Sequence, residues 1–318
     1  MAMRVFVQYE KNDTGKGCFL DRLEREIRNH GVKFEYKDPK KCDVSLSFTH
    51  WRKPCGLPSV LRIDGIYLHL SKSVQWRNDV IKRDIKKADA VIWQSKFCYK
   101  MVGNMLAKGK RNYTIFNGMN PSDFDDVKPI ESPYKRNIVF SAKWGYKTRK
   151  GERVFKRYKD CAKIARNYTE MDKNACCWIL GNTPDKKYRS DRVKYLGWLK
   201  QEKVKQYLKM ADCIVHIPYF DWCPNSVVEA LAAGCYGIAG NSGGQSELVG
   251  EYGTVVQIDT PMKPKHIQPH KVPKIDRGVV LHAIEKFYLD KPAVVMNPNI
   301  HIENVAKQYA KVFTDVLN

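Results

Sequence analysis

Two acids and a glycine pair lie within one short stretch of the chain. Asp221 precedes Glu229 by eight residues, and Gly243-Gly244 follows after a run of small residues. Pro224-Asn225-Ser226 predicts the start of a helix, which would place Glu229 in the first turns. Two carboxylates flanking a helix start can accept hydrogen bonds from hydroxyls, while the helix end and the glycine turn accommodate negative charge. Hydroxyls together with phosphates describe a nucleotide sugar.

The elements around these residues must bring them together. An apolar strand pattern, "DCIVHIPY" (212–219), precedes Asp221, and the helix pattern "PNSVVEALAAG" (224–234) is followed by a second strand pattern, "YGIAG" (236–240). In parallel α/β units, ligands bind beyond the carboxyl ends of the strands. Spacing alone would leave the two acids as ordinary solvated charges, but this setting favours a binding site for such a ligand.

Alternating strand and helix patterns extend over most of the 318 residues. A strand, the "TGKG" turn and a helix over 18–31 open the chain, and the pattern restarts at "NIVFSAK" (137–143), with a basic helix expected over 152–167. The Pro-rich, acidic segment between them predicts a linker. We therefore predict an α/β protein with two units in series, divided as follows: 1–120, linker 121–135, 136–300, and a closing helix over 301–318.

The chain is strongly basic. Its formal net charge is +22, with +13 over residues 141–210 and −6 over residues 211–260. Such an excess predicts a polyanionic partner, namely nucleic acid, anionic lipid or a phosphorylated ligand. No apolar run is long enough for a membrane span and no signal peptide opens the chain, so we expect a cytoplasmic protein, with peripheral contact to an anionic membrane left open. The ten cysteines have no metal-ligand spacing and are interpreted as reduced, buried thiols.

The motif resembles the signature of the retaining GT-B glycosyltransferases of family four, the glycosyl transferases group one. In that family an acid is followed by seven residues, then Glu-Ala, and later by a GG-x-x-E-L segment. This chain has Asp221, Glu229-Ala230 and "GGQSELV" (243–249). Further similarity lies in "YTIFNGMNPSDF" (113–124), "VFSAKWGYKTRKG" (139–151) and "VKYLGWLKQEKV" (193–204). The resemblance covers residues 88–250 well and the first 87 residues loosely. It implies a GT-B fold, in which two Rossmann-like α/β/α domains face a central cleft and the closing helix over 301–318 packs back on the first domain.

The resemblance implies roles for individual residues on the donor side. Glu229 would bind the nucleotide ribose and Asp221 the hydroxyls of the donor sugar, beside the turn at Gly243 and Gly244. Lys143 and Lys150 would contact the diphosphate, with Lys147 or Arg149 as alternatives to Lys150. Trp198 falls where the family contacts the base.

In the first domain, Gly15 and Gly17 resemble the loop that closes over the diphosphate, although "TGKG" alone is equally typical of an ordinary strand-to-helix turn. Asp64 aligns with a position where many members carry a histidine near the donor sugar. Two other departures are the replacement of the usual first Glu by Asp221 and of the usual Arg by Lys143, which offers a point charge in place of a bidentate fork. His50 and His216 are interpreted as structural.

Two hypotheses of different class follow. The first is a retaining glycosyltransferase that moves a sugar from a UDP- or GDP-sugar to an acceptor hydroxyl, with the departing diphosphate taking the acceptor proton and with no metal or other cofactor required. The second is a degenerate transferase fold that only binds a polyanion or nucleic acid. The intact pair of acids favours the first.

The acceptor stays open among DNA with a hydroxylated base, an anionic lipid, and a lipid-linked or free glycan. Trp and Tyr interleave with Lys and Arg in the first domain, as in "KSVQWRNDVIKRDIKK" (72–87) and "KGKRNY" (108–113), and this slightly favours a polyanion. The short loops would suit a viral or phage enzyme, for which the location would be the host-cell cytoplasm.

Overall fold

The computed structural model describes residues 2–9, 15–50, 55–67, 72–103, 106–107, 109–144, 154–260 and 272–318. Within these residues the chain divides into two compact units. The first comprises the described residues up to Asn120 together with Pro298–Asn318, and the second comprises the described residues from Pro121 to Asn297. Each unit contains a six-stranded sheet in which every strand pair is parallel.

The sheet of the first unit has the strand order β2-β1-β3-β4-β5-β6. Its central strands are buried on both faces, as parallel strands covered by helices must be. The switch in strand order falls between β1 and β3. The strands are β1 (Met3–Gln8), β2 (Val32–Glu35), β3 (Val44–Phe48), β4 (Ser59–Ile63), β5 (Ala90–Trp93) and β6 (Arg111–Thr114).

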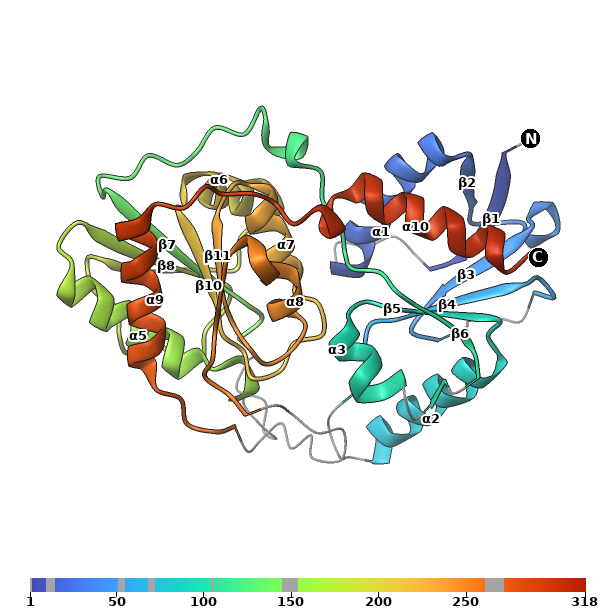
Figure 1. Ribbon diagram of the computed structural model, residues 1–318, viewed down its shortest axis with the longest axis horizontal. Coiled ribbons are helices and arrows are strands. Elements are labelled where there is room, and N and C mark those ends of the chain that lie inside the picture. Colours follow the sequence, from blue (N-terminus) through green and yellow to red (C-terminus); the bar gives the residue numbers. More distant parts are fainter. Residues whose placement is uncertain are drawn as a thin grey trace. The chain divides into compact units, whose positions relative to one another are not determined.

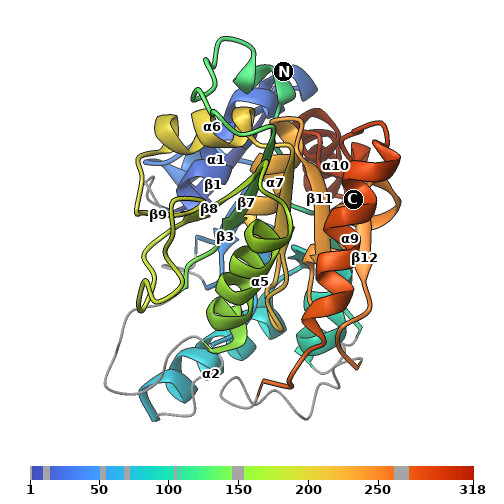
Figure 2. The same ribbon diagram turned by 90° about the vertical axis from the view of Figure 1, so that its left-hand side faces the viewer.

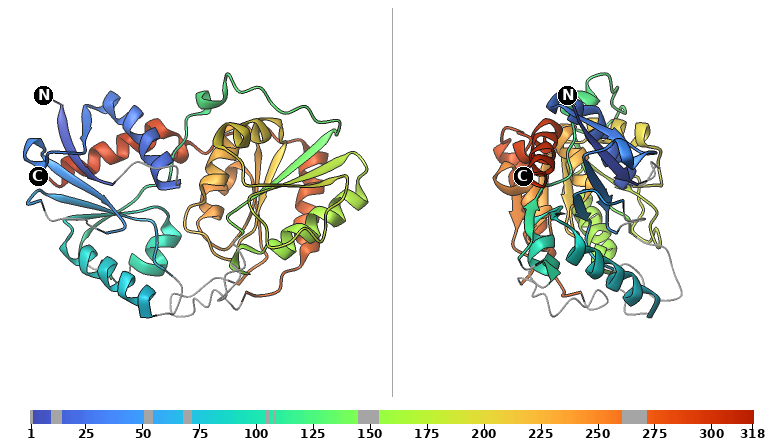
Figure 3. Two further views of the ribbon diagram at one scale, coloured as in Figure 1. Left: turned by 180° about the vertical axis from the view of Figure 1, so that it is seen from behind. Right: turned by 90° about the vertical axis from the view of Figure 1, so that its right-hand side faces the viewer.

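Helices cover both faces of this sheet. Helix α1 (Gly15–Ile27) packs beside α10 (Ile302–Asp315) on one face, and α2 (Lys72–Lys87) and the short α3 (Lys96–Cys98) lie on the other (Figures 1 and 3). A left-handed glycine, Gly31 with φ +74°, ends the first helical segment where the sequence predicts a stop. The apolar stripes of α1 and α10, together with the strands that they cover, form a buried core of this unit.

The sheet of the second unit has the order β12-β11-β10-β7-β8-β9. Its strand-order switch falls between β7 and β10, because the chain winds outward from β7 to β9 and then returns to the other side of β7. The strands are β7 (Arg136–Ser141), β8 (Ala175–Leu180), β9 (Val193–Gly197), β10 (Cys213–His216), β11 (Tyr236–Gly240) and β12 (Thr254–Val256).

Five α-helices are described in this second unit. Helices α5 (Tyr158–Met171) and α9 (Arg277–Asp290) lie side by side on one face of the sheet, as Figure 2 shows most clearly. The others are α6 (Gln201–Met210), α7 (Asn225–Ala232) and α8 (Gln245–Val249), and α7 and α8 cover the opposite face (Figure 1). Side chains of α5, α9 and the sheet share one buried cluster.

The predicted helix over 152–167 is wrong at its start, because α5 begins at Tyr158. Arg157 adopts a left-handed conformation with φ +54°, which a non-glycine residue takes up only when its surroundings hold it there. A further prediction is corrected. Helix α1 begins at Gly15, so Gly15 and Gly17 lie in its first turn and not in a turn before the helix. Farther along the chain, α3 is followed by a π-helix over Tyr99–Gly103.

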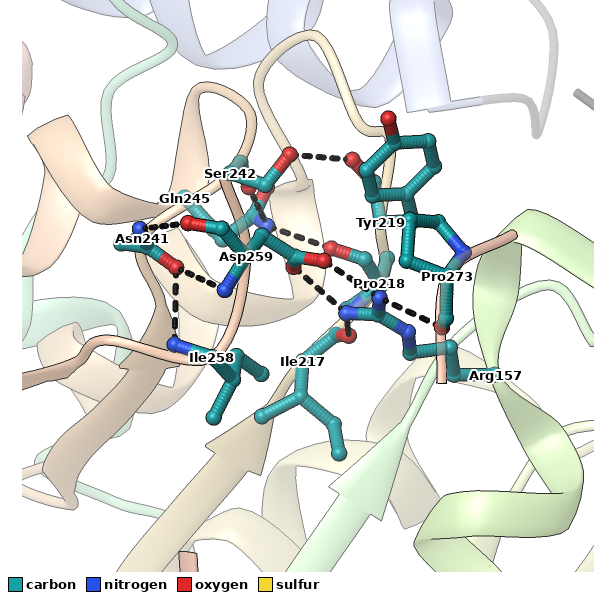
Figure 4. Close-up of polar contacts among 10 residues, drawn as sticks. All are labelled: Arg157, Ile217, Pro218, Tyr219, Asn241, Ser242, Gln245, Ile258, Asp259 and Pro273. Atoms are coloured by element: carbon teal, nitrogen blue, oxygen red, sulfur yellow. Dashed lines mark hydrogen bonds and ion pairs between the residues drawn. The ribbon is translucent and has the colours of Figure 1, made fainter. Parts of the chain in front are cut away.

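The side chain of Arg157 explains its conformation. Its Nη1 and Nη2 donate to the two carboxylate oxygens of Asp259 at 2.6 and 2.5 Å, and both side chains are fully buried (Figure 4). Asn241 in turn holds the backbone of Asp259. Its Nδ2 donates to the Asp259 carbonyl at 2.7 Å, and its Oδ1 accepts from the Asp259 backbone N–H at 3.0 Å. This group joins the segments that follow β7, β11 and β12.

We predict that Arg157→Met lowers the free energy of unfolding by about 3–5 kcal/mol, because it leaves the Asp259 carboxylate buried and unpaired. The double variant Arg157→Met/Asp259→Leu should lose less than the single one. Arg277→Met is the matched control, since its pair with Asp160 is partly exposed and should contribute at most about 1 kcal/mol. Urea unfolding measures all three, and equal losses for Arg157→Met and Arg277→Met would contradict the prediction.

Candidate active site

The switch point of the second sheet brings two loops together. Crevices for ligands form where neighbouring parallel strands connect in opposite directions, outside their carboxyl ends. Here those strands are β7 and β10, so the segment after β7 meets the loop after β10. The backbone N–H of Tyr219 donates to the carbonyl of Phe155 at 2.7 Å, which joins the two segments directly.

The glycine turn predicted from the sequence lies against Asp221. The backbone N–H of Gly244 donates to the Asp221 carbonyl at 2.8 Å. Gly243 has φ +88°, and a Cβ placed on it would lie 2.9 Å from that same carbonyl oxygen. Only glycine fits this conformation and this close approach. The loop of Asp221 and the turn at Gly243-Gly244, both predicted from the sequence, are therefore joined directly through their backbones.

The carboxylate of Asp221 has two buried neighbours. The Nζ of Lys156 contacts its Oδ2, and Nε2 of His216 lies 3.4 Å from the same oxygen. Burial on its own would raise the pKa of Asp221, but the Lys156 charge and His216 outweigh it and hold that pKa below the ordinary value. Asp221 is consequently a carboxylate at neutral pH, ready to accept hydrogen bonds.

Glu229 lies in the second turn of α7, and it is largely buried. The helix begins at Asn225, one residue after Pro224, as the sequence pattern predicts. Asp221 and Glu229 thus stand before and within the same helix start, at the carboxyl edge of the sheet. Their expected roles toward sugar and ribose stay predictions.

The other predicted donor residues are distributed around this edge. Lys143 follows β7 and is exposed, next to Trp144, whose indole N–H donates to the Leu180 carbonyl at 2.7 Å. Trp198 follows β9 and is 70 % exposed, a high value for a tryptophan on a protein surface. Lys147, Arg149 and Lys150 lie outside the described residues.

The first unit has a polar group at its own switch point. The Nζ of Lys16, between Gly15 and Gly17 in the first turn of α1, contacts Oδ2 of Asp64 at 3.1 Å and Oγ1 of Thr49. The structure therefore brings the predicted glycine segment and Asp64 together. Asp64 occupies the position where the resemblance leads one to expect histidine.

A buried arginine supports Asp64. Nη2 of Arg62 lies 2.9 Å from Oδ1 of Asp64, and it also contacts the side-chain oxygens of Asn117 and Gln94. The guanidinium lies 4.2 Å above the ring of Phe19. Burial opposes ionisation of Asp64, but Arg62 and Lys16 together keep its pKa below the ordinary value.

For three residues at the site of the second unit, Lys156, Arg157 and His216, the sequence predicts either a different arrangement or none. The basic pattern places Lys156 and Arg157 in the interior of a helix, where charges usually face solvent. His216 is interpreted as structural, although a histidine at the carboxyl end of an apolar strand is a signal for a place near a ligand edge. No local pattern distinguishes Lys156 from the many other lysines in this segment.

Comparison with known families identifies the segment that carries this site. Residues 135–263 match the family model described as glycosyl transferases group 1. This segment belongs to the group 1 glycosyltransferases. The glycosyltransferase segment contains Asp221, Glu229 and the turn at Gly243-Gly244, and β7 lies at its start.

Solved glycosyltransferases and related enzymes share the fold of the whole chain. Sucrose-phosphate synthase from Thermosynechococcus elongatus matches with a TM-score of 0.69 at 14 % identity, covering 99 % of both chains. A glycosyltransferase from Rickettsia africae matches with 0.61 at 11 % identity, covering 100 % of this chain and 99 % of the other. Anabaena HepE, solved with UDP and glucose, matches with 0.56 at 14 % identity, covering 100 % and 96 %. The fold is GT-B.

Curated proteins, by contrast, provide no significant sequence match. Within the described part of the chain, no group of three or more His, Cys, Asp or Glu residues is placed to hold a metal ion. The helices that the structure describes are all too short or too polar to cross a membrane. All ten cysteines lie in the described residues and none of them forms a disulfide. Burial raises the pKa of thiols such as Cys177 and Cys213, which makes them unreactive.

We predict that Gly243→Ala destabilises the glycosyltransferase segment and loosens the Asp221 loop. A Cβ there would meet the Asp221 backbone, in addition to the cost of about 1–2 kcal/mol for a left-handed residue with a side chain. Gly234→Ala is the matched control, because Gly234 has φ +91° but open space around it. Hydrogen exchange at the Gly244 N–H should accelerate in Gly243→Ala only. Equal acceleration in both variants would contradict the predicted steric conflict.

Proposed function

We propose that the protein is a retaining glycosyltransferase that takes a sugar from a nucleoside diphosphate sugar. The observation that carries this proposal is the joined structure of Asp221 and the Gly243-Gly244 turn at the switch point, within a group 1 glycosyltransferase segment. The complex of Anabaena HepE with UDP and glucose supports UDP-sugars as the first donors to test.

The described residues offer complementary contacts for the parts of such a donor. Asp221 presents an ionised carboxylate to the sugar hydroxyls. Glu229, near the start of α7, would accept from the ribose hydroxyls, and the exposed Trp198 offers an aromatic surface for the base. Lys143, with the cations at Lys147, Arg149 or Lys150, would stabilise charge on the diphosphate.

Catalysis would then rest on positioning and on stabilisation of the leaving group. The bond from the anomeric carbon to the diphosphate oxygen breaks, and the acceptor oxygen bonds to that carbon on the same face. The departing diphosphate takes the proton of the acceptor hydroxyl. Cationic side chains are proposed to neutralise the diphosphate, so turnover should persist without a divalent metal.

Donor binding by single variants tests these roles. Glu229→Gln should weaken UDP and the UDP-sugar alike, because both contain the ribose. Asp221→Asn should weaken only the UDP-sugar, by about 10- to 100-fold, as expected for the loss of a hydrogen bond to a charged group. Calorimetry in EDTA, with slow UDP-sugar hydrolysis as the activity readout, measures both effects. Loss of turnover in EDTA that magnesium or manganese restores would contradict metal independence.

The acceptor is proposed to be polyanionic because the charge of +22 far exceeds what one diphosphate requires. In the first unit, Trp76 on α2 is exposed, and Arg77 lies over the ring of Tyr67 at 5.4 Å. Aromatic groups interleaved with cations suit stacking on bases together with contacts to phosphates. DNA that carries a hydroxylated base combines these features with an acceptor hydroxyl, and anionic lipids and glycans are the alternatives.

Salt dependence tests the polyanion. If the acceptor is such DNA, the logarithm of the DNA-binding constant should fall linearly with the logarithm of the salt concentration. Lys108→Glu/Lys110→Glu should make this slope shallower by the amount expected for the loss of about two phosphate contacts. Lys203→Glu/Lys209→Glu, a pair of exposed lysines on α6, is the control and should leave the slope almost unchanged.

Transfer of labelled sugar to hydroxymethylated duplex DNA, anionic vesicles and soluble glycans should be compared side by side. Label found only in soluble glycans would end the polyanion proposal and leave the donor site intact. A protein that binds DNA with steep salt dependence, but gains no thermal stability from UDP or GDP, would be a binding module with a degenerate transferase fold.

A further inference from the structure

The two oxygens of the Asp221 carboxylate have different surroundings. Oδ2 contacts Lys156 and lies near His216, while Oδ1 forms no hydrogen bond or ion pair with the residues that the structure describes. The Asp221 side chain is 17 % exposed, whereas those of Lys156 and His216 are only 11 % and 2 % exposed. One face of the carboxylate is therefore fixed from inside the protein and the other face is accessible.

Lys156 reaches this position through its neighbours in sequence. Phe155 accepts from the Tyr219 N–H at 2.7 Å, and its ring packs edge-on against Phe220 at 6.3 Å. On the other side, Arg157 is locked by its bidentate pair with Asp259. Because both flanking residues are held, the Lys156 backbone has little freedom, and its side chain is directed toward the loop of Asp221.

While its ring is neutral, His216 cannot take the place of Lys156 as the cation beside the Asp221 carboxylate. Its Nδ1 lies 3.1 Å from the carbonyl of Ser141 in β7, and because a carbonyl only accepts, Nδ1 carries the proton. A neutral ring then turns the lone pair of Nε2 toward the Asp221 carboxylate. Burial, helped by the Lys156 charge and opposed by Asp221, lowers the pKa of His216, so the ring is neutral near pH 7.

We propose that Lys156 is a positioning residue that holds Oδ2 of Asp221 so that Oδ1 accepts a hydroxyl of the donor sugar, with His216 as a second support that acts only when protonated. This inference rests on the proposed function. Among the described residues, the charged groups that face His216 are Lys156, from the turn before α5, and Asp221, from the loop after β10. The Ser141 carbonyl faces it from β7.

A consequence of this arrangement is a new pH dependence when Lys156 is removed. In Lys156→Met, the His216 ring loses a repulsive cation while Asp221 loses its main partner. The imidazolium form then becomes the buried cation that can hold Oδ2. Binding of the donor sugar should therefore be strong at low pH and should fall as the pH rises through the His216 titration.

Calorimetry between pH 5.5 and 8.5 tests this prediction with UDP and a UDP-sugar as separate probes. In the wild type, the ratio of the two affinities should be flat with pH. In Lys156→Met, UDP-sugar affinity should fall about 10-fold or more at pH 8 and recover toward pH 5.5, because the charge-assisted hydrogen bond from His216 exists only while the ring is protonated. UDP affinity should stay within about twofold over the same range, since UDP has no donor sugar.

Two further variants separate positioning from packing. Lys156→Arg should keep the flat profile, and Lys156→Met/His216→Asn should lose the recovery at low pH. A recovery that persists in the double variant would overturn the role of His216. Equal weakening of UDP and UDP-sugar in Lys156→Met, or no weakening, would overturn the positioning role of Lys156.

NMR titration of the His216 ring gives a readout that needs no donor. The midpoint should rise by about one pH unit or more in Lys156→Met, because a nearby like charge is removed. An unchanged midpoint in a protein that binds donor would overturn this inference alone. A wild type that binds no nucleotide sugar would overturn the proposed function, and with it the contact to sugar, whatever the His216 titration shows.

Discussion

The ion pair between Arg157 and Asp259 fixes the carboxyl edge of the second sheet. A charge pair without solvent contact is stable only when its geometry is good and further hydrogen bonds support it. Here the bidentate geometry matches both carboxylate oxygens, and the carbonyls of Ile217 and Pro273 accept further bonds from the guanidinium. Asn241 holds the backbone of Asp259. The pair ties the segment after β7 to the end of β12. Because Lys156 is the residue before Arg157, the same constraint that closes the edge also delivers a cation to Asp221.

The first unit uses a related device with a different outcome. Arg62 is as deeply buried as Arg157, but its partner Asp64 is shared with a second cation, Lys16 on α1. In both units a buried arginine lies at the carboxyl edge near the strand-order switch. In the second unit the arginine stabilises the edge, whereas in the first it supports the acid that stands where many members of the resembling family have histidine.

Much of the site could be predicted because its residues form a local pattern. Asp221, the helix start at Asn225 and the turn at Gly243-Gly244 follow from spacing and from the conformation that glycine allows. Lys156 could not be predicted, because its partner lies 65 residues further along the chain and only the parallel pairing of β7 with β10 brings them together. The predicted start of α5 is wrong for a similar reason: Arg157 leaves helical geometry to reach Asp259, a contact 102 residues away.

Acids of the acidic segment are paired with cations of the basic segment, which the net charge of the chain does not reveal. The segment 211–260 carries −6 in a chain of +22, and two of its acids are Asp221 and Asp259. Each is paired with one of two consecutive cations, Lys156 and Arg157, from the most basic part of the chain. An arginine suits the closed pair because its planar fork satisfies both oxygens of Asp259. A lysine suits Asp221 because a single ammonium group can hold one oxygen and leave the other for a ligand.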